Sequence, residues 1–201
     1  MNQDGSIRAA SQTMGDLVLS SAAVPPAALV VAMSFIIALC AQITFPLPFT
    51  PVPLTGSTLG VLLAGALLGS RRGSYAVALY LAEGAAGLPF FAGGAAGFVH
   101  FAGPTGGYLI GFLPAAYVAG RLAEAGWDKT PFKTFMMMLL GSGVILAMGL
   151  LGLARFVPAP RLLPMGLYPF LPGDAAKACI AAALLPGGWT LLGARASGRR
   201  Q

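Results

Sequence analysis

Charged side chains are scarce in this sequence of 201 residues. Lys, Arg, Asp and Glu make up 9% of it, whereas a soluble domain carries about 25%. No charged residue lies between Asp16 and Arg71, or between Glu83 and Arg121. Both stretches are longer than the roughly 20 apolar residues that one helix needs to cross a bilayer. The scarcity of charge therefore excludes an ordinary soluble domain and predicts an all-α integral membrane protein.

Residues that build catalytic and metal sites are scarce as well. The sequence has a single histidine, His100, and two cysteines, Cys40 and Cys179, which both lie inside apolar segments. It has no HExxH motif, and no lysine stands in the context of a phosphate-binding P-loop. We expect both cysteines to be buried small hydrophobic residues. The sequence thus predicts no enzyme, no metal site, no cofactor and no ATP hydrolysis by this chain.

Apolar patterning predicts six transmembrane helices within a single domain that spans residues 1–201. The helices are expected over residues 24–41, 56–69, 73–88, 106–123, 134–157 and 173–192, with Pro114 as a kink in the fourth. The second is short, because 14 residues span roughly 21 Å and the hydrocarbon core is about 30 Å thick. Residues 1–23 form an N-terminal segment, residues 24–195 the six-helix domain and residues 196–201 a tail.

The net charge of +6 indicates orientation in a membrane rather than binding to nucleic acid. Nine of the twelve cationic residues lie on one predicted side, namely Arg8, Arg71, Arg72, Arg121, Lys129, Lys133, Arg195, Arg199 and Arg200. Because cytoplasmic loops are enriched in Lys and Arg, both termini are expected in the cytoplasm. The sequence therefore predicts a multi-pass protein of the cell (inner or plasma) membrane, with the loops after helices one, three and five outside.

Those three external loops hold the unusual sequence. The first, FPLPFTPVPLT, contains four prolines and cannot continue a helix, so we expect an extended cap folded back on the protein; a simple connector is the alternative. The second, LPFFAGGAAGFVHFAGPTGG, has no helical period and is expected to line a cavity or to lie outside the bilayer. The external face is therefore where a solute is expected to be captured.

Asp174 and Lys177 form the most informative charged pair. They lie three positions apart in FLPGDAAK, so a helix places them on one face. Ionisable groups at membrane depth are costly and usually functional, although Asp174 alone could cap the helix N-terminus. A carboxylate accepts N–H groups and an ammonium group donates to oxygen, so the pair suits a small solute that carries both kinds of group.

The motifs, taken in order, resemble a known transporter family. QITFPLPFTPVPLT, TLGVLLAGALLGSRRG, GLPFFAGGAAG, GPTGGYLIGF and PFLPGDAAKA are similar to segments of the biotin-specific substrate-binding subunits (BioY-type S-components) of energy-coupling-factor transporters. The resemblance covers about residues 40–190. It implies a six-helix protein that binds biotin from outside and works with an energy-coupling transmembrane subunit and two ATP-binding subunits, although some members are reported to act without them.

The resemblance also implies a set of binding residues. Asp174 is expected to accept from the ureido N–H groups of biotin, and Lys177 to donate to a ligand oxygen. Two positions depart from the family pattern: Ser57 stands where glutamine is expected, and Glu83 where the family is usually apolar. Glu83 and His100 are weaker candidates for the same pocket. The substrate-binding candidates are Asp174, Lys177, Tyr108, Gly93, Gly94, Phe91 and Thr50.

Two alternative functions stay open at this point. One is an S-component for a different vitamin, and another is a membrane-embedded enzyme, which would need more acidic or histidine residues than this chain has.

The surroundings of Ala28 and Ala32 in the first helix are also open. Their spacing lets helices approach closely in lipid. They are expected either to face the partner subunit or to pack within this chain.

Overall fold

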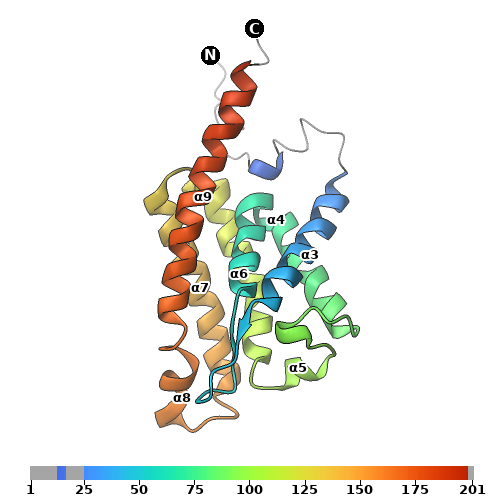
Figure 1. The fold of residues 1–201 in the computed structure, drawn as a ribbon, viewed down its shortest axis with the longest axis vertical. Coiled ribbons are helices and arrows are strands. Elements are labelled where there is room, and N and C mark those ends of the chain that lie inside the picture. Colours follow the sequence, from blue (N-terminus) through green and yellow to red (C-terminus); the bar gives the residue numbers. More distant parts are fainter. Residues whose placement is uncertain (1–12, 17–24, 199–201) are drawn as a thin grey trace.

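The computed structural model describes residues 13–16 and 25–198, and it is mostly helical (Figure 1). Long helices pack side by side in a bundle, with a short helical turn over residues 14–16 at one end. The long helices are α3 (Pro26–Gln42), α4 (Ser57–Ala85), α6 (Gly106–Glu124), α7 (Pro131–Leu153) and α9 (Leu171–Gly198). The shorter elements are β1 (Thr44–Phe45), β2 (Leu54–Thr55), η1 (Ala92–Gly94), α5 (Val99–Ala102), η2 (Trp127–Lys129) and α8 (Ala159–Gly166).

A sharp break at Gly69 divides α4 into two halves that fold back on each other. Gly69 has φ 82° and ψ 176°, a combination that is essentially restricted to glycine. A Cβ added at Gly73 would lie 2.6 Å from the carbonyl oxygen of Ala64, which a straight helix would hold several turns away. The two helices expected over residues 56–69 and 73–88 are therefore the two halves of α4. The elbow between them, residues 68–70, leaves no intervening loop.

The proline-rich segment is extended, as expected, but it is more ordered than a simple connector. Its flanks pair as antiparallel strands, with Thr44 opposite Thr55 and Phe45 opposite Leu54. Within the segment Thr50 and Val52 are buried, whereas Phe49 is exposed. The fold is mostly helical, as expected, and this small sheet is an addition to it: the prolines prevent a helix but leave room for two short strands at the ends of the segment.

Other boundaries differ from the expected ones by a few residues. Helix α7 begins at Pro131, where proline occupies the first turn and loses no helical hydrogen bond, and it ends at Leu153 rather than Val157. Helix α8 was not expected, because its segment is rich in proline. Pro160 falls in its first turn, where proline is tolerated, whereas Pro164 lies inside the helix. Pro114 lies inside a continuous α6.

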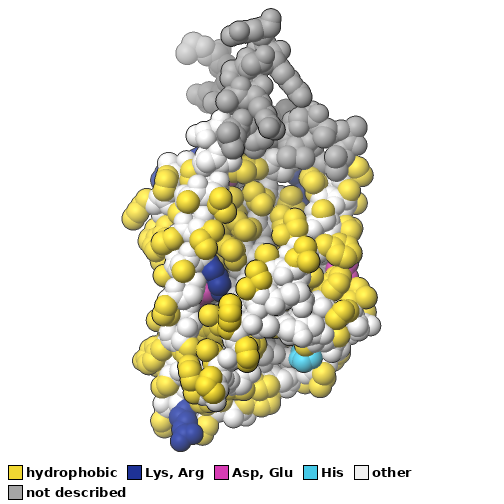
Figure 2. Space-filling view, viewed as in Figure 1, with side chains coloured by type: hydrophobic (Ala, Val, Ile, Leu, Met, Phe, Trp, Pro, Cys, Tyr) yellow, Lys and Arg dark blue, Asp and Glu magenta, His cyan; other side chains and the backbone are white. Residues whose placement is uncertain are grey.

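The outer surface of the bundle is apolar. Figure 2 shows hydrophobic side chains spread over much of one face, with few charged ones among them. Among the described residues, α7 is the one helix long and apolar enough to cross a membrane by length and composition, and α3 is a shorter apolar helix. The expectation that Cys179 is buried is wrong, since Cys179 is exposed, and Cys40 is half-buried. Apolar side chains cover the outside of this bundle as well as its interior. The apolar surroundings of Cys179 in the sequence therefore do not require that its side chain be buried.

Candidate functional site

A cavity of about 270 Å³ opens at the end of the bundle that holds the strands, α5 and α8 (Figure 1). The proline-rich loop, η1, α5 and the first turns of α4, α6 and α9 contribute to its lining. Most of the lining side chains are apolar or aromatic. The polar and ionisable ones are Thr55, Ser57, Thr58, Tyr80, His100, Thr105, Tyr108, Asp174 and Lys177. An apolar pocket with a few convergent polar groups is the usual form of a small-molecule site.

Asp174 and Lys177 form an ion pair in this cavity. Lys177 Nζ lies 3.2 Å from Asp174 Oδ1, and the side chains are 18% and 6% exposed. Lys177 Nζ also donates a hydrogen bond to Thr58 Oγ1 at 2.7 Å, which ties α9 to α4. No backbone N–H of the described residues donates to the Asp174 carboxylate, so its partner is Lys177 rather than a helix terminus. Two charges removed from water need such partners, because each alone costs several kcal/mol.

Aromatic side chains form one wall of the cavity. Phe91 makes edge-to-face contacts with Tyr80 and His100, at centroid distances of 5.8 and 5.9 Å, which is the preferred geometry of aromatic pairs. Tyr108 packs against Phe170 at 5.9 Å and donates its hydroxyl hydrogen to the carbonyl of Gly166 at 2.8 Å. These contacts orient the rings, so the wall is formed before any ligand enters.

The proline-rich loop is fixed over the cavity by one side chain. Thr50 Oγ1 donates to the carbonyl of Met165 at 2.8 Å and accepts from the backbone N–H of Val52 at 3.2 Å. Val52, which is 4% exposed, lines the cavity together with Pro51 and Pro53. The loop and the end of α8 therefore meet directly above the site.

The structure brings four of the seven candidate binding residues into the cavity lining: Phe91, Tyr108, Asp174 and Lys177. Gly93 and Gly94 lie in η1, between the lining residues Ala92 and Ala95, and are not part of the lining themselves. Thr50 holds the loop rather than lining the cavity. Of the weaker candidates, His100 lines the cavity and Glu83 does not; one carboxylate oxygen of Glu83 is buried without a hydrogen-bond partner among the described residues.

Sequence reasoning missed several lining residues. Thr58 is the clearest case, because it lies next to Ser57 in a segment that reads as an ordinary apolar helix. Its role as the partner of Lys177 joins positions 119 residues apart, and no local pattern indicates such a contact. Others are apolar or aromatic residues of helix interiors, namely Tyr80, Leu109, Phe112, Ile145 and Leu146, and Phe170 in the turn before α9.

Known proteins resemble this chain over most of its length. The model of the BioY family matches residues 11–194. The biotin transporter BioY of Rhizobium etli is 37% identical, with 75% of this chain and 86% of that protein covered. The biotin transporter BioY of Rhodobacter capsulatus is 42% identical, with 77% and 84% covered.

A solved structure shares the fold. The crystal structure of the S-component for biotin from an ECF-type ABC transporter superposes with a TM-score of 0.71, at 24% identity, and covers 92% of this chain and 93% of its own. The family match extends from the turn at residues 14–16 into α9, and so includes every element that lines the cavity. This chain belongs to the BioY family.

Proposed function

We propose that this protein is the biotin-binding subunit of an ECF-type transporter and captures biotin in the 270 Å³ cavity. The observation that carries the proposal is the buried Asp174–Lys177 pair beside an aromatic wall. Membership in a transporter family implies a membrane location, and we assign the chain to the cytoplasmic membrane.

The chemistry of biotin fits the lining. Its fused ring carries two ureido N–H donors and a carbonyl, and its valerate tail ends in a carboxylate. The Asp174 carboxylate accepts from the ureido N–H groups, while Lys177 donates to an oxygen of the ligand. Phe91 and Tyr108 supply apolar area for the ring and the tail. Because the side chains of the ion pair are largely buried by the protein itself, little further dehydration is needed when the ligand enters.

Calorimetry with the purified protein tests this assignment directly. We expect biotin to bind in detergent, and thiamine and riboflavin not to bind. Mass spectrometry of the ligand retained through purification is an independent check. If another vitamin is retained and titration with biotin gives no heat of binding, the alternative of an S-component for a different substrate is supported.

Six membrane spans follow if the two halves of α4 are counted separately. We assign them to α3, the two halves of α4, α6, α7 and α9, with both termini in the cytoplasm. The first half of α4 is short, but many of its residues are buried in the protein, including Val61, Leu62 and Ala64, so it need not match the bilayer thickness. The cavity then faces outwards, and Arg71, Arg72 and Arg121 lie on the cytoplasmic side, as the positive-inside rule requires.

Helix α3 presents a surface for the energy-coupling subunit. Ala28 and Ala32 are both exposed, and so are Val31, Phe35 and Leu39. The two alanines therefore do not pack inside this chain, and the alternative of internal packing is wrong. Small residues at this spacing let a second helix approach closely, which favours a helix of the partner over lipid alone.

Replacing Ala32 by Trp is expected to abolish biotin uptake and leave biotin affinity unchanged. The indole fills the space that a partner helix needs, while the cavity lies beyond the other side of α3. Uptake is measured in cells that express the partner subunits, and affinity in detergent. Ala183→Trp, the same change on the exposed face of α9, is the matched control and keeps uptake. Normal uptake with Ala32→Trp would exclude this face as the interface.

A further inference from the structure

A second cavity, of about 350 Å³, lies at the opposite end of the bundle from the candidate biotin site. It forms where the turn at residues 14–16 and the end of α6 meet the elbow of α4. Its lining is mostly polar and charged, and consists of Thr13, Asp16, Leu68, Ser70, Arg71, Arg72, Arg121 and Glu124. Nothing in biotin binding explains why three arginines gather there.

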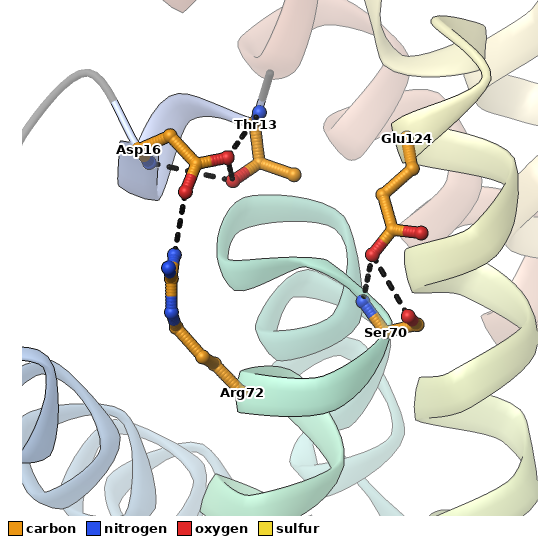
Figure 3. Close-up of polar contacts among 5 residues, drawn as sticks. All are labelled: Thr13, Asp16, Ser70, Arg72 and Glu124. Carbon is orange, nitrogen blue, oxygen red and sulfur yellow. Dashed lines mark hydrogen bonds and ion pairs between the residues drawn. The ribbon is translucent and has the colours of Figure 1, made fainter. Parts of the chain in front are cut away.

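The carboxylate of Glu124 is fully engaged by the protein. Its Oε1 accepts from the backbone N–H and the hydroxyl of Ser70, at 2.7 and 2.8 Å (Figure 3). Its Oε2 pairs with Arg121 at 3.2 Å. Because Ser70 opens the second half of α4, the carboxylate also sits favourably at a helix N-terminus. Glu124 thus stabilises the elbow and has little capacity left for a ligand.

Asp16 is engaged in the same way. Its Oδ1 pairs with Arg72 at 2.6 Å, and its Oδ2 accepts from the backbone N–H and the hydroxyl of Thr13, at 2.9 and 3.0 Å (Figure 3). Burial acts to raise the pKa of Asp16, but the hydrogen bonds from Thr13 and Arg72 outweigh it and hold the pKa below its usual value. Asp16 therefore remains ionised and its acceptor oxygens are occupied.

The arginines, in contrast, use few of their donors in contacts with the residues that the structure describes. A guanidinium group has five N–H donors, and the ion pairs of Arg72 and Arg121 each use only Nη1. Arg71 is exposed and makes no ion pair with any residue in the described part of the chain. Three guanidinium groups beside two carboxylates that are already hydrogen-bonded leave a net positive charge and an excess of donors among the lining residues, which is the chemistry that recognises an oxyanion.

We propose that this cavity binds the phosphate group of an anionic ligand. Arginine suits phosphate because its planar fork of donors matches the phosphate oxygens. The topology assigned above puts the elbow at the cytoplasmic surface of the bilayer, where anionic phospholipid headgroups are concentrated. A phospholipid headgroup and free phosphate are the two sources of this chemistry, and a headgroup is the one that we expect.

Lipid binding to the purified, delipidated full-length protein tests the site. We expect dioleoylphosphatidylglycerol to bind, as measured by native mass spectrometry, and zwitterionic dioleoylphosphatidylcholine to bind at least about tenfold more weakly. Arg71→Gln is expected to weaken phosphatidylglycerol binding by about tenfold, the loss of one charge-assisted contact. Arg161→Gln, a change at an exposed arginine of α8 at the other end of the bundle, is the control and has no effect.

The possible outcomes show whether the site binds a phosphate group and, separately, whether that group belongs to a lipid or is free phosphate. Displacement of the lipid by millimolar inorganic phosphate, with the same dependence on Arg71, would support the site and identify free phosphate as a ligand. Equal affinity of the wild type and Arg71→Gln for phosphatidylglycerol would overturn the proposal. The biotin affinity of Arg71→Gln is measured in parallel and stays at the wild-type value, so this test and that of the biotin site can fail independently.

Discussion

Asp174→Asn is expected to weaken biotin binding by at least about 30-fold. Removing one partner of a buried, hydrogen-bonded charge pair typically costs 2 to 5 kcal/mol or more, and the Asp174 side chain is 6% exposed. The amide keeps the shape of the carboxylate, but it accepts less strongly from ureido N–H groups and leaves Lys177 without a counter-ion. Titration calorimetry of the purified variant measures the loss.

A matched substitution separates this effect from a general disturbance. Asp128 is also fully buried, accepts a hydrogen bond from Trp189 Nε1 at 2.6 Å and lies outside the cavity lining. Asp128→Asn is therefore expected to keep biotin affinity within about threefold of the wild type. Unchanged binding by Asp174→Asn, or equal losses in both variants, would remove Asp174 from the site.

Gly69→Ala is expected to destabilise the bundle clearly. The backbone at Gly69 has φ 82° and ψ 176°, and a side chain there costs of order 1–3 kcal/mol in backbone strain. A Cβ would also lie 2.9 Å from Glu124 Oε1, which disturbs the hydrogen bonds of that oxygen to Ser70. We expect the apparent midpoint of thermal unfolding in detergent to fall by several degrees.

The control for this substitution is Gly143→Ala in α7. Gly143 lies in a helix, and an added Cβ would meet no atom within 4 Å. Alanine is favoured over glycine by about 1 kcal/mol in a helix interior, so this variant is expected to be as stable as the wild type or more so. Equal midpoints for Gly69→Ala and the wild type would show that the elbow tolerates a side chain.

The sequence predicts those features that depend on local composition. Long uncharged segments indicate the helices, and Gly69 followed by Arg71 and Arg72 marks the end of one span. The Asp174–Lys177 pair is visible because its two members lie one helical turn apart. These signals need no knowledge of the three-dimensional structure.

What escapes prediction depends on contacts between distant segments. The bond of Lys177 to Thr58 and that of Thr50 to Met165 join residues more than 100 positions apart. Helix α8 was missed because its segment is rich in proline, which disfavours helix interiors; Pro160 is tolerated in the first turn, and Pro164 lies inside the helix all the same. The prediction that both cysteines are buried is wrong for Cys179, which is exposed. Apolar residues occupy both the core and the outer surface of this protein, so an apolar segment does not show which of its residues are buried.

The hydrogen bonds of Thr50 and Tyr108 end on adjacent residues. Thr50 donates to the carbonyl of Met165 and Tyr108 to that of Gly166, so the loop over the cavity and its aromatic wall are held by neighbouring peptide units at the end of α8. A movement that breaks one bond displaces the acceptor of the other. The loop and the wall therefore share one energetic unit, in which the cost of releasing both is less than the sum of the two separate costs.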